Sequence, residues 1–174
     1  MSQSAPTQIR LLGLGNLMRT DDAVGMLTAR MLTDSGRLPS TIEVIEGGTL
    51  GLDLLGQLDG TSHLLVLDAV DSGAAPGTQK SFQGDELARL PTSKSVHLLG
   101  LSDLVNAMLL MGAPPMEIIL LGVQPESTDW GTALTPAVEA AQSGLIEAAL
   151  EQIKRWTKEI SSATTETVPV LAIP

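Results

Sequence analysis

The chain has no cysteine and no tyrosine, and it contains one phenylalanine and two tryptophans among 174 residues. The absence of cysteine excludes disulfide bonds, thiolate metal sites and a cysteine nucleophile. Because aromatic side chains are so few, the protein has little surface on which bases or sugars could stack. Hydrophobic residues nevertheless make up 43% of the chain, so we expect a core built from aliphatic side chains.

Basic residues are also scarce. Ten Lys and Arg stand against 20 Asp and Glu, which gives a net charge of −10. Such a surface repels phosphate backbones, and we expect no nucleic-acid partner. The sequence shows no run of about 18 apolar residues and no basic-plus-apolar opening segment, so we expect no membrane association and a cytoplasmic location.

Apolar segments of two periodicities alternate along the chain. Strands are expected at 8–13, 42–46, 63–68, 78–83 and 117–123, and helices at 22–34, 51–57, 101–111 and 136–160. Continuous apolar strands such as HLLVLDAV and EIILLGV are typical of a parallel sheet covered on both faces. The segment DSGAAPG is too short for a helical crossover, so strand 78–83 is expected to be antiparallel. We expect one α/β domain over residues 1–160, built around a mostly parallel sheet, and a loosely ordered tail over 161–174.

The last helix has the clearest pattern. Thr135 and Pro136 suit its N-cap and first helical position. Apolar residues then recur at steps of three or four: Val138, Ala141, Leu145, Ala149, Ile153, Trp156 and Ile160. This spacing predicts a long amphipathic helix.

The loop GLGNLMRTDDAVG, residues 13–25, joins the first strand to a helix. Met18 stands where the dinucleotide-binding fingerprint has its third glycine, and no Gly-Lys-Ser/Thr follows. Two carboxylates here would also repel a phosphate, so we reject anion binding. Two interpretations of Asp21 and Asp22 remain. They are either first-turn acids that interact with the helix dipole behind a Thr20 cap, or the source of a carboxylate directed at a cation.

Two further residues bear on the cation interpretation. Asp68 ends the apolar strand HLLVLD, where a carboxylate is costly unless it is paired, solvated or bound to a cation. His97 immediately precedes the helix expected at 101–111, where a lone histidine is more often a cap or a surface residue. In a mostly parallel sheet, the loop after the first strand and the end of the third share the carboxyl edge, where such sheets bind ligands. Asp22, Asp68 and His97 would then form an O,O,N set suited to zinc or nickel. His63 begins its strand and is expected at the opposite end.

The turn EGGT follows the second strand and is expected at the same edge. Its glycines suit a tight turn with positive φ. The segment equally suits a backbone surface that receives an extended substrate peptide. Glu46, Gly47, Gly48 and Thr49 are therefore candidate substrate-binding residues, with a purely structural turn as the alternative.

Five segments occur in order along the chain: LGLGNLMRTDDAVG, IEGGTLGLDLLG, LDAVDSGAAPGT, SVHLLGLSDLV and GVQPESTDWGTALTP. Together they resemble the hydrogenase maturation endopeptidases from about residue 9 to residue 157. The resemblance implies a three-layer α/β/α sandwich of the phosphorylase/hydrolase-like type, with a five-stranded twisted sheet in which one strand is antiparallel. By motif position it implies Asp22, Asp68 and His97 as catalytic and metal-binding residues.

The resemblance also implies an activity and a partner. The expected reaction removes a C-terminal extension from the large-subunit precursor of a nickel–iron hydrogenase once nickel has been inserted. The expected metal is nickel supplied by the substrate. The chain departs from the family pattern where Asp22 replaces a frequent glutamate, where Leu98 follows the histidine in place of Gln or Glu, and where Ala133 replaces a glycine.

Two other functions are alternatives. A nickel-sensing chaperone that binds the precursor without cutting it would use the same ligands. A peptidyl-tRNA hydrolase has a related fold and the same opening GLGN, but that family continues with Pro-Gly and needs a histidine next to asparagine. Here Leu17 and Met18 follow Asn16, and neither histidine precedes an asparagine.

Overall fold

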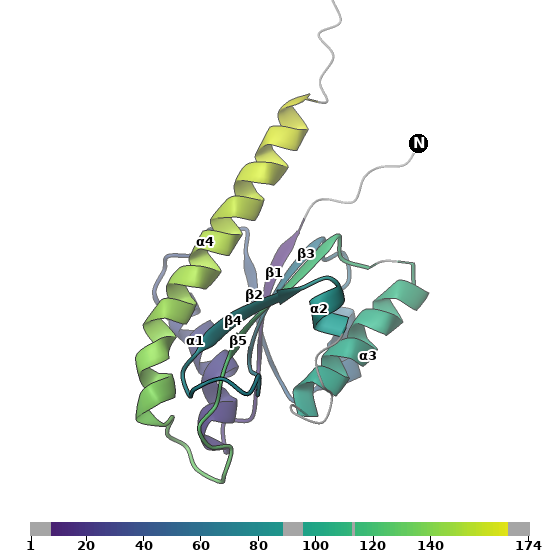
Figure 1. The fold of residues 1–174 in the computed structure, drawn as a ribbon. Coiled ribbons are helices and arrows are strands. Elements are labelled where there is room, and N and C mark those ends of the chain that lie inside the picture. Colours follow the sequence, from purple (N-terminus) through teal and green to yellow (C-terminus); the bar gives the residue numbers. More distant parts are fainter. Residues whose placement is uncertain (1–7, 89–95, 113, 167–174) are drawn as a thin grey trace, which may run out of the picture.

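A computed structural model describes residues 8–88, 96–112 and 114–166 (Figure 1). Five strands form one sheet in the order β2-β1-β3-β5-β4. They are β1 (Ile9–Leu14), β2 (Glu43–Gly48), β3 (His63–Ala69), β4 (Gln79–Gln83) and β5 (Glu117–Val123). Neighbouring strands pair in parallel except β4, which is antiparallel to β5. The predicted sheet is confirmed, including its antiparallel strand, which pairs with β5 at the edge of the sheet.

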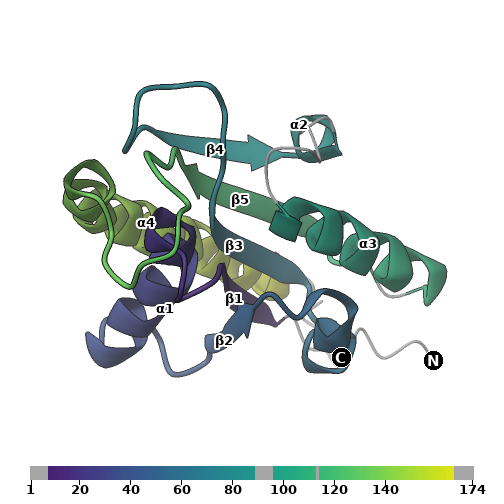
Figure 2. The ribbon, with the colours of Figure 1, turned by 90° about the horizontal axis from the view of Figure 1, so that it is seen from below.

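Helices cover both faces of this sheet, as Figure 2 shows from below. On one face lie α1 (Val24–Asp34) and α4 (Pro136–Glu166), and on the other lie α3 (Val96–Leu110) and the 3-10 helix η2 (Gly51–Gln57). The remaining elements are the 3-10 turn η1 (Thr20–Ala23) and the short helix α2 (Asp85–Ala88). The three-layer α/β/α sandwich is therefore confirmed.

Two aliphatic clusters fill the spaces between the layers. Successive side chains of a strand point to opposite faces, so Leu65 and Leu67 of β3 join the cluster under α1 and α4. Leu64 and Val66 of the same strand join the cluster under α3 and η2. Burial on both faces explains why β3 has a continuous apolar sequence. In the described ranges, no helix is long and apolar enough to cross a membrane.

Helix α3 begins earlier than predicted. It starts at Val96, so His97 lies within its first turn and not before it. Gly100 is an interior residue of this helix, where a glycine costs about 1 kcal/mol relative to alanine. Burial of Leu101 and Leu104 against η2 and the sheet outweighs that cost, since each buried leucine contributes about 1.5–3 kcal/mol.

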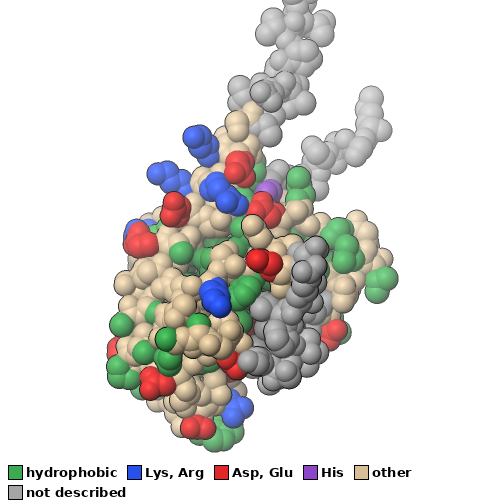
Figure 3. Space-filling model, in the orientation of Figure 1, with side chains coloured by type: hydrophobic (Ala, Val, Ile, Leu, Met, Phe, Trp, Pro, Cys, Tyr) green, Lys and Arg blue, Asp and Glu red, His purple; other side chains and the backbone are tan. Residues whose placement is uncertain are grey.

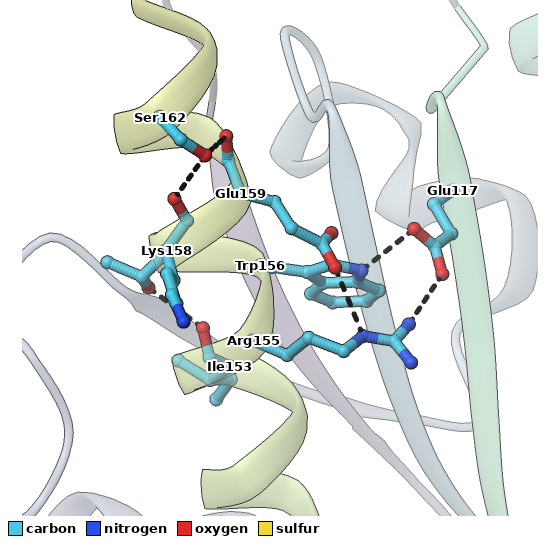
Figure 4. Close-up of polar contacts among 8 residues, drawn as sticks. Glu117, Ile153, Arg155, Trp156, Lys158, Glu159 and Ser162 are labelled. Carbon is cyan, nitrogen blue, oxygen red and sulfur yellow. Dashed lines mark hydrogen bonds and ion pairs between the residues drawn. The ribbon is translucent and has the colours of Figure 1, made fainter. Parts of the chain in front are cut away.

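Helix α4 ends later than the predicted residue 160, because it continues to Glu166. Its predicted apolar stripe is confirmed, with Val138, Leu145 and Trp156 fully buried. Beyond the stripe, the Ser161 hydroxyl donates to the carbonyl of Thr157. The Ser162 hydroxyl donates to the carbonyl of Lys158 (Figure 4). These hydrogen bonds lie in the last part of α4, residues 161–166, which the apolar periodicity of the sequence does not predict.

Trp156 is the largest fully buried side chain, and it joins α4 to the amino ends of two strands. Its indole N–H donates to Oε2 of Glu117, 2.9 Å away, while Arg155 donates to Oε1 over 3.1 Å (Figure 4). The edge of the His63 ring meets the indole, with centroids 5.1 Å apart. His63 is the first residue of β3, so the prediction that it lies at the opposite end of the strand from Asp68 is confirmed.

We expect His63 to make stability depend on pH. Burial lowers the pKa of His63, although Glu117 and Glu159 act in the opposite direction. The unfolded chain therefore binds this proton at a higher pH than the folded chain does. The free energy of unfolding should then fall as the pH drops below the ordinary histidine pKa of about 6.5, and this loss should level off below the lowered folded pKa. Denaturant unfolding of His63→Gln at the same pH values should show a shallower fall, whereas equal slopes would contradict the assignment.

Helix α1 lies unusually close to the sheet at Gly25. A β-carbon at this position would collide with the carbonyl oxygens of Leu14 and Leu67, which are backbone atoms and cannot rotate away. We expect Gly25→Ala to lower the free energy of unfolding by about 3 kcal/mol. Gly56→Ala is the matched control, because a β-carbon there meets nothing and the change should stabilise by about 0.4–1 kcal/mol. Thermal or denaturant unfolding distinguishes the two variants, and similar effects would refute the close approach.

Candidate active site

The loops that follow the parallel strands meet at the carboxyl edge of the sheet. The Gly15 N–H, after β1, donates to the carbonyl of Gly48 at the end of β2 over 3.0 Å. Helix α3 ends just before β5, whose first residue Glu117 pairs with His63 at the amino end of β3. The helix therefore runs antiparallel to the parallel strands and begins at the carboxyl edge (Figure 1). This edge brings together the backbone of the three predicted site segments.

Gly15 shapes the loop that carries Asp22. Its φ is +130°, which L side chains rarely adopt, and a β-carbon there would collide with the carbonyl oxygen of Asp22. The Asp22 carboxylate accepts a hydrogen bond from the Asn16 N–H over 3.0 Å, and the Asp22 N–H donates to the carbonyl of Arg19 over 2.8 Å. Gly15 therefore permits a tight backbone turn in which the Asn16 N–H holds the Asp22 carboxylate.

Asp68 is fully buried near the end of β3. By strand alternation its side chain belongs to the series of Leu64 and Val66, which faces the layer of α3 and η2. Its Oδ1 accepts the N–H of Ala69 over 2.8 Å. A carboxylate kept away from water at this position needs polar or cationic partners, and α3 begins on the same face of the sheet.

The His97 side chain lies outside the described residues, while its backbone lies in the first turn of α3. Among the side chains that the structure describes, no group of three His, Asp or Glu residues forms a metal cluster. The ligand set of Asp22, Asp68 and His97 therefore stays a prediction.

The other aspartate of the pair has a different environment. Asp21 is fully buried, and its carboxylate accepts four hydrogen bonds from the loop between β5 and α4. The donors are the N–H groups of Glu126, Ser127 and Thr135, at 2.8, 3.0 and 2.7 Å, and the Thr135 hydroxyl at 2.9 Å. Asp21 thus fixes the β5–α4 loop to the loop after β1. Sequence reasoning missed this role, because its donors lie more than 100 residues away and three of them are backbone groups of unremarkable residues.

Thr20 does not cap the helix as the dipole interpretation expected. It has a φ of +27°, and its hydroxyl donates to the carbonyl of Ser127 over 2.6 Å. The residue that precedes α1 is Ala23, which makes no side-chain cap hydrogen bond. The β5–α4 loop therefore takes the Thr20 hydroxyl, just as it takes the Asp21 carboxylate.

The EGGT segment forms the end of β2 and the turn after it. Gly48 has a φ of +55°, which confirms the tight turn. A β-carbon on Gly47 would lie 2.6 Å from Cδ1 of Leu12, so the leucine side chain would have to shift to accept it. The exposed Glu46 carboxylate forms an ion pair with Arg30 at 2.6 Å. Thr49 is exposed at the same edge. Substrate binding by these four residues stays a prediction.

The fold and its carboxyl edge define an α/β sandwich with acidic side chains at the position where such sheets bind ligands, an arrangement suited to hydrolysis. Comparison with known proteins is more specific. The family model described as hydrogenase maturation protease matches residues 26–152. The chain is 40% identical over 154 residues to the hydrogenase 2 maturation protease of Escherichia coli, which covers 87% of this chain and 92% of that protein. It is 32% identical to the hydrogenase expression/formation protein HupD of Rhodobacter capsulatus, over 92% and 78% of the two chains.

Solved structures agree with these relatives. The hydrogenase maturating endopeptidase HybD from Escherichia coli superposes with a TM-score of 0.79 at 36% identity, over 86% of this chain and 93% of that chain. The [NiFe] hydrogenase maturation protease HybD from Thermococcus kodakarensis gives a TM-score of 0.72 at 25% identity, over 84% and 99%. This chain belongs to the hydrogenase maturation protease family and is a peptidase. The resemblance inferred from the sequence is confirmed, and the peptidyl-tRNA hydrolase alternative is set aside.

The two adjacent aspartates should respond differently to mutation. Asp21→Ala leaves three N–H groups and a hydroxyl without their acceptor in a buried site, and each buried unsatisfied group costs about 1–3 kcal/mol. We therefore expect Asp21→Ala to lower the free energy of unfolding by more than about 3 kcal/mol, and Asp22→Ala, at a half-buried position, by clearly less. Denaturant unfolding of the two variants measures the difference, and equal losses would contradict the structural role of Asp21.

Proposed function

We propose that this peptidase removes a C-terminal extension from the large-subunit precursor of a nickel–iron hydrogenase, and that it recognises the nickel already inserted in that precursor. The observation that carries the proposal is the fully buried Asp68 carboxylate, located on the same sheet edge as Asp22 in a member of this family. Carboxylate oxygens held at this edge are ligands of the kind that a borderline divalent cation accepts.

In this proposal nickel arrives as part of the substrate. Carboxylate oxygens of Asp22 and Asp68 and an imidazole nitrogen of His97 would complete its coordination, since oxygen and nitrogen ligands suit a borderline divalent metal. Binding through the metal places the nearby peptide bond at the carboxyl edge. The metal, or one of the two carboxylates acting as a general base, then activates the attacking water, and the proton that the water loses passes to the leaving amine.

The extended precursor peptide is proposed to lie against the turn after β2. Thr49 is exposed at the carboxyl edge, directly after the turn at Gly48, and an extended peptide is commonly recognised through main-chain hydrogen bonds. Gly47 is buried beside Leu12 and adds no side chain between the turn and the layer beneath it. Glu46 contributes through its ion pair with Arg30, which fixes the outer side of the same segment.

The reaction is tested with purified precursor in nickel-loaded and nickel-free forms. We expect the protein to shorten only the nickel-loaded form, as read by intact mass. Asp68→Asn and Asp22→Asn keep the side-chain shape but remove the charge, and each should slow processing by about 100-fold or more, because general acid–base groups contribute at least that much. Glu151→Gln, an exposed change on α4, is the matched control.

Two results would count against the proposal. A nickel-loaded precursor that forms a complex with the protein yet keeps its mass would indicate a chaperone that does not cut. Normal processing by a folded Asp68→Asn variant would remove Asp68 from the reaction. Unfolding curves of each variant separate loss of activity from loss of fold.

A further inference from the structure

The carboxyl edge also carries large apolar side chains in solvent. Trp130 is 78% exposed and Met18 is 55% exposed. They belong to the β5–α4 loop and to the loop after β1, which lie side by side because Arg19 and Gly131 form a parallel bridge. The Gly131 N–H donates to the carbonyl of Met18 over 3.0 Å, and the Thr20 N–H donates to the carbonyl of Gly131 over 2.9 Å. Two distant segments therefore present Trp130 and Met18 from neighbouring positions.

Trp130 packs against Arg19 of the neighbouring loop. The Arg19 guanidinium lies over the indole, with its central carbon 5.4 Å from the ring centroid. The Arg19 Nε also donates to the carbonyl of Thr128 over 3.0 Å. Beneath these contacts, the buried Asp21 carboxylate fixes the whole loop. The Arg19 contact favours one placement of the indole, and a side chain with fewer accessible placements loses less conformational entropy when a partner binds.

The apolar pair is continuous with the candidate active site. The Met18 N–H donates to the Asn16 side-chain oxygen over 2.9 Å, and the Asn16 N–H donates to the Asp22 carboxylate. The β5–α4 loop reaches the lower end of the molecule in Figure 1, and Figure 3 shows hydrophobic side chains beside a basic one at that end. A protein that placed a peptide bond at Asp22 would therefore bring its folded surface against Trp130 and Met18.

We propose that Trp130, Met18 and Arg19 form a docking surface for the folded body of the precursor, outside the segment that is cut. This inference rests on the proposed function. The occupant would offer an apolar recess for the indole, because tryptophan, methionine and arginine are enriched at protein interfaces and tryptophan and arginine dominate their binding energy. The docking surface would let the enzyme hold a large substrate independently of the contacts made to the scissile peptide.

Other exposed apolar residues lie far from this edge and provide the control. Leu110 is 90% exposed and Met116 is 82% exposed. They flank the connection from α3 to β5, and β5 begins opposite His63 at the amino end of the sheet. A substrate engaged at the carboxyl edge would not reach them.

The test measures processing and binding of the nickel-loaded precursor by Trp130→Ala, Trp130→Phe and Leu110→Ala. We expect Trp130→Ala to raise the KM for the precursor, and the Kd of the complex, by about 30-fold, the size of an interface hot spot, with the effect on KM rather than on kcat. Trp130→Phe should recover part of the affinity, and Leu110→Ala should match the wild type. Because Trp130 is mostly exposed, all three variants should unfold at nearly the wild-type temperature.

The outcomes separate the two proposals. If the wild type cuts the nickel-loaded precursor and Trp130→Ala has an unchanged KM and Kd, the docking surface is wrong while the proposed function stands. If the wild type leaves the precursor uncut, the proposed function fails. The Kd of the Trp130→Ala complex, compared with that of the wild type, still decides whether the docking surface binds the precursor. A fall in kcat alone, or an equal weakening by Leu110→Ala, would also overturn the docking surface.

Discussion

The buried Asp21 carboxylate holds the carboxyl edge of this protein together. Its hydrogen bonds to the backbone of Glu126, Ser127 and Thr135 connect the loop after β1 with the loop before α4. Without this acceptor, three N–H groups and the Thr135 hydroxyl would lose their partner in a buried site, and the two loops would lose four of the hydrogen bonds that join them. Asp22 and Trp130 both take their positions from this anchored pair of loops.

The second constraint is the close approach of α1 to the sheet. Gly25 lets the helix backbone pack directly on the carbonyls of β1 and β3, and Gly15 lets the chain turn sharply enough to reach that position. The opening loop therefore keeps its glycines for steric reasons that have nothing to do with phosphate. The same spacing that suggests a nucleotide-binding loop serves to bring a carboxylate to the edge of a sheet.

The sequence alone was sufficient for the architecture, since continuous apolar strands and a short connection identified the parallel strands and the antiparallel one. Its errors came from interactions that local patterns do not carry. Thr20 resembled a helix cap, but a distant carbonyl takes its hydroxyl. The ends of α3 and α4 were misjudged because apolar periodicity does not mark them. The role of Asp21 could not be predicted, because its partners are mainly backbone groups brought close only by the fold.

Trp130 lies outside the core of the molecule, so its side chain can change independently of the fold. Its side chain rests on Arg19 and lies mostly in solvent, so a substitution there disturbs neither the sheet nor the anchored loops. The Asp21 carboxylate, in contrast, is buried and tied to the fold by hydrogen bonds, so a change there alters the anchored loops. If the proposed docking surface operates, a substitution of Trp130 changes which protein substrate is bound without touching the acidic residues of the carboxyl edge.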